Sequence, residues 1–253
     1  MYSSSRIQQV QAHNQLMTKL YQQEINNSIA SSTIYSVDSQ QPANFFSSTQ
    51  TLQELWINST TQAVSRLSST YPQAKIACLN FADYEQTAGG YLQAALAQEE
   101  AICFDSTLYQ VLLAFPEYYA WNREHLANYL YQDRAIYSPG IIFHQKQYLA
   151  SADIITCAAP FYRKSALLQL PYSQALQALK LRMTFVKQIA EDQHVDYLVL
   201  GTWGAGVFGF NSLDVAKLWK KTFAEKSSIK KVIYAVIPSH NNQAVDNFQK
   251  IFI

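Results

Sequence analysis

Apolar residues in the first 70 positions recur at helical spacing. Between residues 6 and 24 they include Ile7, Val10, Leu16 and Leu20, which predicts an amphipathic helix. A polar, loop-like stretch covers residues 38–50. Residues 52–67 then predict a second helix, for which Thr51 is a suitable N-cap. The segment 1–70 is therefore expected to be helical.

The pattern changes from residue 75 onward. Four segments become almost continuously apolar, as is typical of strands buried on both faces of a sheet: 76–82, 154–159, 197–200 and 232–237. Helical spacing fills the stretches between them, at 92–113, 117–131, 173–191 and 212–226. This alternation predicts an α/β fold with a mainly parallel sheet covered on both faces. Neither an internal repeat nor a linker interrupts it, so we expect one domain over residues 1–253, with its core at 75–253.

Composition narrows the function classes. The chain has 253 residues, and its 19 Lys and Arg nearly balance its 18 Asp and Glu, for a formal net charge of +1. A chain without a basic block lacks the electrostatic footprint of a protein that binds nucleic-acid duplexes. An anionic ligand held by backbone amides remains compatible with this charge, because amides add no formal charge.

The remaining composition indicates a cytoplasmic protein. Three widely spaced cysteines, Cys78, Cys103 and Cys157, fit buried thiols in a reducing compartment better than a disulfide framework. The N-terminus has no apolar signal core, and no run of about 18 apolar residues predicts a membrane span. The five histidines show no metal-ligand spacing, so we expect neither a metal nor a cofactor.

Seven glycines fall into three short segments: Gly89-Gly90, Gly140, and the four glycines of residues 201–209. The two larger segments follow predicted strands and precede predicted helices. At such points backbone amides and a helix N-terminus can hold phosphate. Tight turns are the alternative explanation. We call residues 88–90 the first glycine loop and residues 201–209 the second.

The second glycine loop contains the dinucleotide-binding pattern G-x-G-x-x-G, at residues 204–209. A Rossmann site is nevertheless disfavoured. The match lies near the C-terminus, its turn is longer than a Rossmann turn, and no acidic residue ends the following strand at Val236-Ile237-Pro238. Neither loop is followed by the lysine of a nucleoside triphosphatase.

Several motifs in order resemble one known family. Asn80-Phe81-Ala82, Ala88-Gly89-Gly90 and Gln98-Glu99-Glu100 are similar to the signature of poly(ADP-ribose) glycohydrolases of the bacterial type. In that signature a glycine triplet precedes Gln-Glu-Glu. The likeness extends to residues 106–109, 137–140 and 198–209, and covers about residues 75–253. It implies a macrodomain-like, three-layer α/β/α fold with a mixed, mainly parallel central sheet, and makes residues 1–70 an accessory helical segment.

The resemblance also implies a glycosidase. Glu100 is then the acid that protonates the leaving atom, and Glu99 holds the ribose hydroxyls. A carboxylic acid suits this chemistry because cleavage of a ribosyl bond passes through an oxocarbenium-like state. Two adjacent carboxylates also raise each other's proton affinity. The alternative is that Glu99 and Glu100 are solvated residues at a helix end.

The family's ligand contacts map onto both loops. An ADP-ribose ligand is expected to contact Asn80, Ala88, Gly89, Gly90, Gly204, Ala205, Gly206, Val207 and Phe208. In the family the second loop wraps the diphosphate, and the aromatic residue at Phe208 packs on the distal ribose. A place for Phe208 in the core is the alternative.

Two departures from the family pattern bear on the substrate. The family's Pro-Gly-Gly-Gly is Thr87-Ala88-Gly89-Gly90 here, and the second Asn of its Asn-Phe-Ala-Asn run is Asp83. A carboxylate beside the anomeric carbon can steady an oxocarbenium ion or pair with a guanidinium. Asp83 is therefore counted with the catalytic residues, unless it caps a turn.

These departures favour release of ADP-ribose from mono-ADP-ribosylated protein, with arginine as the favoured linkage. A polymer glycohydrolase and a non-catalytic ADP-ribose-binding module are the alternatives. We expect a monomer whose partner is the ADP-ribose moiety of a modified protein. The Gln-, Asn- and Ser-rich composition would also suit an effector delivered into a host cell by a non-classical route.

Overall fold

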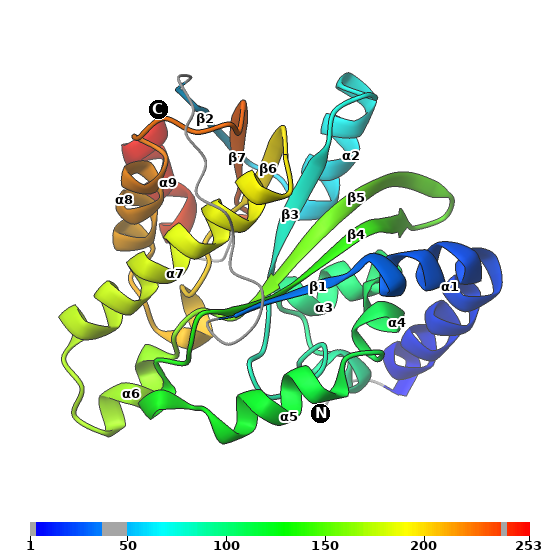
Figure 1. Cartoon of the computed structure of the whole chain (residues 1–253), viewed down its shortest axis with the longest axis horizontal. Coiled ribbons are helices and arrows are strands. Elements are labelled where there is room, and N and C mark those ends of the chain that lie inside the picture. Colours follow the sequence, from blue (N-terminus) through cyan, green and yellow to red (C-terminus); the bar gives the residue numbers. More distant parts are fainter. Residues whose placement is uncertain (1–3, 37–49, 239–241) are drawn as a thin grey trace.

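The computed structural model describes residues 4–36, 50–238 and 242–253. Its strands are β1 (Thr33–Ser36), β2 (Leu52–Trp56), β3 (Ile76–Phe81), β4 (Arg134–His144), β5 (Tyr148–Cys157), β6 (Tyr197–Leu200) and β7 (Lys231–Ala235). They form one sheet in the order β1-β4-β5-β3-β6-β7-β2 (Figure 1). The pairs β1–β4 and β4–β5 are antiparallel, and the four other pairs are parallel. The predicted mixed, mainly parallel sheet is confirmed.

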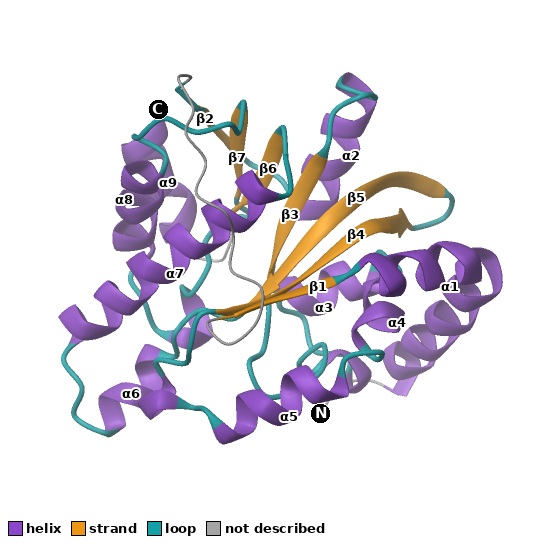
Figure 2. Cartoon of the chain, in the orientation of Figure 1, coloured by secondary structure: helices purple, strands orange, loops and turns teal. Residues whose placement is uncertain are grey.

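Helices cover both faces of this sheet (Figure 2). They are α1 (Ser4–Ser31), α2 (Thr60–Thr70), α3 (Gln98–Phe104), α4 (Leu108–Leu112), α5 (Pro116–Glu124), α6 (Tyr162–Leu167), α7 (Tyr172–Asp192), α8 (Ser212–Thr222) and α9 (Gln243–Phe252). Successive residues of β3 point to opposite faces. Ala77 and Leu79 join a core with α7, α8 and α9, whereas Ile76 and Cys78 join a second core with α1 to α5. The chain therefore has the three-layer α/β/α architecture.

Residues 52–67 do not form the predicted helix. Leu52, Leu55 and Trp56 fit helical spacing, but they lie in strand β2, which pairs with β7 along the edge of the sheet. The predicted N-cap Thr51 instead donates a hydrogen bond from Oγ1 to the Ile229 carbonyl oxygen. The helix begins only at Thr60. Pairing with a distant strand thus overrides the local spacing.

Ser59 is the N-cap of α2. Its Oγ accepts a hydrogen bond from the Gln62 N–H at 3.2 Å, and the Gln62 side chain accepts one from the Ser59 N–H at 2.9 Å, which completes a capping box. We expect Ser59→Ala to lower the free energy of unfolding by about 1 kcal/mol, because the Gln62 N–H loses its hydrogen-bond acceptor and the capping box is broken. Urea denaturation measures this. The exposed Ser151→Ala removes a hydroxyl that caps no helix, so an equal loss of unfolding free energy in both variants would contradict the assignment.

The other element predictions were partly right. Helix α7 matches residues 173–191 closely, and β6 matches 197–200. The predicted helix at 92–113 is broken into a single turn at Tyr91–Gln93, which ends at a left-handed Ala94, and then α3 and α4, which residues 105–107 separate. The predicted helix at 117–131 ends at Glu124. The first helix extends to Ser31 with a non-helical residue at Tyr21.

Two further strands, β1 and β4, and two helices, α6 and α9, were not predicted from the sequence. Strand β4 contains Pro139-Gly140, where the pairing with β5 shifts register between Ser138 and Ile141. Segment 1–70 is therefore not purely helical, because it supplies an edge strand at each end of the sheet. Most of the polar stretch 38–50 lies outside the described residues.

Candidate active site

Five parallel strands end at the same edge of the sheet. A cleft of about 380 Å³ lies there, lined by residues that follow β2, β3, β6 and β7 and by the start of α3. Its lining comprises residues 58–61, 96–98, 101, 102, 105 and 202–208, together with Phe81, Ala235 and Ile237. Ligands of open α/β sheets bind outside the carboxyl ends of the strands. The cleft is therefore the candidate ligand site.

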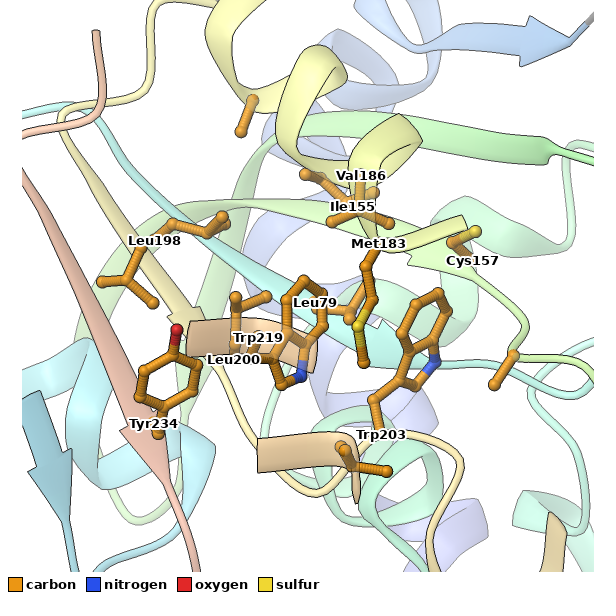
Figure 3. Close-up of a cluster of buried hydrophobic side chains, with 14 of the residues drawn as sticks. Leu79, Ile155, Cys157, Met183, Val186, Leu198, Leu200, Trp203, Trp219 and Tyr234 are labelled. Carbon is orange, nitrogen blue, oxygen red and sulfur yellow. The ribbon is translucent and has the colours of Figure 1, made fainter. Parts of the chain in front are cut away.

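The second glycine loop forms one wall of this cleft. It leaves β6 at Gly201, where an added Cβ would lie 2.6 Å from the Ala235 carbonyl oxygen. Trp203 anchors the loop in the core, fully buried and stacked on Trp219 at 5.9 Å between ring centroids (Figure 3). Gly204 to Phe208 all line the cleft, and their contacts with a diphosphate stay a prediction.

The first glycine loop lies against two carboxylates. A Cβ added to Gly89 would lie 2.8 Å from Glu100 Oε1 and 3.0 Å from Glu99 Oε2. Gly90 donates its N–H to Glu100 Oε1 at 2.9 Å. Ala88, which stands in place of a family glycine, is buried and keeps a left-handed φ of 57°. The loop therefore retains a glycine-like backbone despite its substitution.

Glu99 and Glu100 are buried, not solvated. They lie in the first turn of α3, with 3% and 8% of their surfaces exposed. A carboxylate that ionises at this end of a helix interacts favourably with the helix dipole. The Glu100 Oε2 atom is buried, and no described residue donates a hydrogen bond to it. A buried carboxylate oxygen left without a partner is costly, so this atom is available to a ligand or a proton.

Glu99 is held on both oxygens. Asn80 Nδ2 donates to Oε1 at 3.0 Å, and the Asp83 N–H donates to Oε2 at 2.8 Å. Asn80 is fully buried, so in this structure it positions Glu99. Gln98, a residue absent from the predicted contacts, joins α3 to the end of β3. It accepts from the Phe81 N–H and donates to the Leu79 carbonyl oxygen, each at 2.8 Å.

Burial raises the pKa of Glu99 well above its usual value, and the charges of Asp83 and Glu100 add to this, although the hydrogen bonds from Asp83 and Asn80 oppose it. A raised folded-state pKa means that the folded protein binds this proton more tightly than the unfolded chain. Folding stability is therefore lost as pH rises above the unfolded-state pKa of about 4.5, until the raised folded-state pKa is passed.

We expect wild type to lose stability relative to Glu99→Gln as pH rises above about 4.5, because glutamine has no proton to lose. Free energies of unfolding in urea measure this difference at each pH. The exposed Glu117→Gln is the control for the same chemical change at a solvated position. A Glu99→Gln difference that did not change with pH would contradict the raised pKa.

Asp83 caps a turn. Its Oδ1 accepts hydrogen bonds from the Glu85 and Gln86 N–H groups at 2.7 and 2.8 Å. A turn cap is the alternative that the sequence offered to a catalytic role of Asp83. Asp83 is nonetheless half-buried between Glu99 and Gly89, and its Oδ2 accepts no hydrogen bond from the described residues. The structure thus leaves one of its oxygens free for substrate.

Phe208 stacks on Phe161, with 4.6 Å between ring centroids and 23° between ring planes. It lines the cleft and is half-buried, so it is not an ordinary core residue. Phe161 was not predicted. Its position in the sequence could have indicated it, because Phe161 follows the apolar run 154–159, which includes the end of strand β5 beside β3. Residues 58–61 were missed because β2 was taken for a helix.

The described residues bring together no group of three or more His, Cys, Asp or Glu side chains that could hold a metal ion. None of their helices has the length and apolar character needed to cross a membrane.

Solved structures resemble the whole chain. Poly(ADP-ribose) glycohydrolase from Thermomonospora curvata has a TM-score of 0.89 and 24% identity, over 99% of this chain and 100% of that one. A structure of it bound to the inhibitor ADP-HPD has a TM-score of 0.86 and 24% identity, over 98% and 99%. The Deinococcus radiodurans glycohydrolase in complex with ADP-ribose has a TM-score of 0.76 and 27% identity, over 89% and 96%.

Sequence comparison assigns the family. A search of curated proteins gives no significant match. The family model for the catalytic domain of microbial-type poly(ADP-ribose) glycohydrolase, however, matches residues 4–146, which is more than half of the chain. This match includes the first glycine loop and both glutamates. The chain therefore belongs to the family of microbial-type poly(ADP-ribose) glycohydrolase catalytic domains.

Proposed function

We propose that this protein hydrolyses the bond between the distal ribose of ADP-ribose and an arginine side chain, and so releases ADP-ribose from mono-ADP-ribosylated protein. Its family makes it a glycosidase-type hydrolase that cleaves ADP-ribose glycosidic bonds. The observation that carries the proposal is Glu100, which Gly90 fixes through one oxygen while the buried Oε2 has no partner. Such a carboxyl group is suited to act as a general acid.

In the proposed reaction the bond from the anomeric carbon to the leaving atom breaks. The protonated Glu100 carboxyl gives its proton to that atom, and a water oxygen bonds to the anomeric carbon. The same group then takes up the proton that water releases. Glu99, held by Asn80 and Asp83, is assigned the role of accepting hydrogen bonds from the ribose hydroxyls. No cofactor takes part.

The arginine linkage rests on Asp83. Its Oδ2 accepts no hydrogen bond from the described residues, and a guanidinium bound there would gain a charged partner. The turn cap weighs against this reading, because Oδ1 is already engaged by two amides. Polymer cleavage is the second candidate, and the Deinococcus radiodurans glycohydrolase, which was solved with ADP-ribose, favours it.

The test is to incubate the protein with ADP-ribose polymer and with arginine-, serine- and glutamate-linked ADP-ribosylated proteins. Release of ADP-ribose from the arginine linkage supports the proposal. Cleavage of polymer alone would overturn the part assigned to Asp83. No release from any substrate, with tight ADP-ribose binding by calorimetry, would leave a binding module.

We also propose that the protein acts as a monomer in the cytoplasm, of its own cell or of a host into which it is delivered. Sedimentation at concentrations that support turnover tests the first part, and a species of twice the monomer mass would contradict it.

A further inference from the structure

A charged and aromatic cluster lies beside the carboxylates. It consists of Glu85, Tyr129, Phe161 and Lys164, and we call it the acceptor-side cluster. Lys164 Nζ lies 3.4 Å from Glu85 Oε1 and 5.0 Å from the ring centroids of both Tyr129 and Phe161. The Lys164 and Glu85 side chains are 42% and 29% exposed. An incoming molecule can therefore reach both.

The cluster connects the two walls of the site. On one side Phe161 stacks on Phe208 of the second glycine loop. On the other, the Glu85 N–H donates to Asp83 Oδ1, and the Asp83 N–H donates to Glu99 Oε2. The ion pair of Glu85 and Lys164 thus lies only two hydrogen bonds along the backbone from a catalytic carboxylate.

The order of the strands places the cluster on the leaving-group side. The cleft extends across the sheet from the ends of β2 and β7, along the second glycine loop after β6, to Phe81 at the end of β3. Phe161 follows β5, the next strand along. The ADP portion occupies the cleft under the proposed function, so whatever is attached to the distal ribose projects towards β5.

The backbone that carries Tyr129 is strained and firmly held. Ala127, Asn128 and Tyr129 have positive φ values of 45°, 56° and 64°. Because none of them is glycine, this left-handed conformation costs roughly 1 kcal/mol for each residue. The Phe161 N–H donates to the Tyr129 carbonyl oxygen at 2.8 Å. The buried Arg182 donates to the carbonyl oxygens of Leu130 and Ala158, at 3.4 and 2.8 Å. Strain that is pinned in this way is characteristic of functional sites.

We infer that Lys164 and Glu85 form a charge pair that sets which leaving group the site accepts. With the pair intact, Lys164 neutralises Glu85, and Asp83 dominates the local charge. Loss of the lysine charge leaves Glu85 and Asp83 opposed only by Arg123, which donates to the Glu85 carbonyl oxygen at 2.9 Å, and this favours a cationic guanidinium. Loss of the glutamate charge leaves Lys164 without its anionic partner. The lysine can then pair with the diphosphate of a further ADP-ribose unit, whose base can lie on the aromatic rings of Tyr129 and Phe161. The inference rests on the proposed function, because it requires the acceptor to lie at β5.

The test compares two dissociation constants in the non-hydrolysing Glu100→Gln background: that of an arginine-ADP-ribosylated peptide and that of a short ADP-ribose polymer. Lys164→Met should shift their ratio roughly threefold to tenfold towards the peptide, and Glu85→Gln by a similar factor towards the polymer. Both shifts should shrink at high salt. Lys164→Arg should keep the wild-type ratio, and the exposed Lys146→Met is the distant control.

Binding and turnover separate the two ideas. A ratio that does not move in either variant, or moves the same way in both, overturns the inference whatever the parent enzyme cleaves. Failure of the parent to cleave any ADP-ribosylated substrate overturns the proposed function, while opposite shifts in the binding ratio would still support the charge pair.

Discussion

Glu100→Gln is expected to lower kcat roughly 10²- to 10⁴-fold and to change the Kd for ADP-ribose little. Glutamine keeps an oxygen in place for the Gly90 N–H, which donates to Glu100 Oε1 at 2.9 Å, so the first glycine loop should stay in position. It cannot supply the proton that the leaving atom needs. Chromatographic measurement of released ADP-ribose gives kcat, and calorimetry with ADP-ribose gives Kd.

The control for this variant is Glu117→Gln, which makes the same chemical change at an exposed position of α5. It should leave both quantities unchanged. Turnover by Glu100→Gln at the wild-type rate would remove Glu100 from the mechanism. Loss of binding together with turnover would instead make Glu100 a residue that supports the loop.

Gly89→Ala is expected to reduce kcat/KM about 10²-fold, because displacement of a reacting group by about 1 Å can have that effect. The new Cβ would lie 2.8 Å from Glu100 Oε1 and 3.0 Å from Glu99 Oε2, and both carboxylates are buried and hydrogen-bonded. Steady-state kinetics measures the change. The left-handed φ of 53° should also cost about 1 kcal/mol of stability.

Gly140→Ala separates the two effects of that substitution. Gly140 has a left-handed φ of 69°, and an added Cβ would meet no atom within 4 Å. It should therefore lose similar stability in urea denaturation but retain activity. If the two variants lost activity equally, backbone strain and not contact with the carboxylates would be the cause.

The sequence predicted the centre of the sheet better than its edges. Strand β6 is short and fully apolar, and burial on both faces leaves few alternatives for such a segment. Edge strand β2 has its apolar residues at positions 52, 55 and 56, which suit a helix equally well. Strand β4 contains Pro139-Gly140, which locally indicates a turn. Pairing with β7, far along the chain, decides the case of β2, whereas pairing with the neighbouring strand β5 decides the case of β4.

The candidate site divides in the same way. The second glycine loop and the Gln-Glu-Glu segment belong to motifs that occur in order along the sequence, so their place beside the cleft could be expected. Their partners could not. The Asn80 side chain donates to Glu99, and one Asp83 oxygen accepts from two backbone N–H groups. Both arrangements depend on backbone geometry that a sequence motif does not contain. Phe161 and Lys164 reach the site through the adjacency of β5 and β3.

The pairing of β2 with β7 has a consequence for synthesis of the chain. Leu52 lies opposite Lys231, so β2 leaves the ribosome long before its partner exists. Closing such a large loop comes late in folding, because its entropic cost precedes the contacts that offset it. Residues 58–61, which follow β2, form the far wall of the cleft. A nascent chain therefore completes its ligand site only after residues 231–235 have been translated, and until then β2 has no strand to pair with and is exposed to aggregation, which chaperones can prevent.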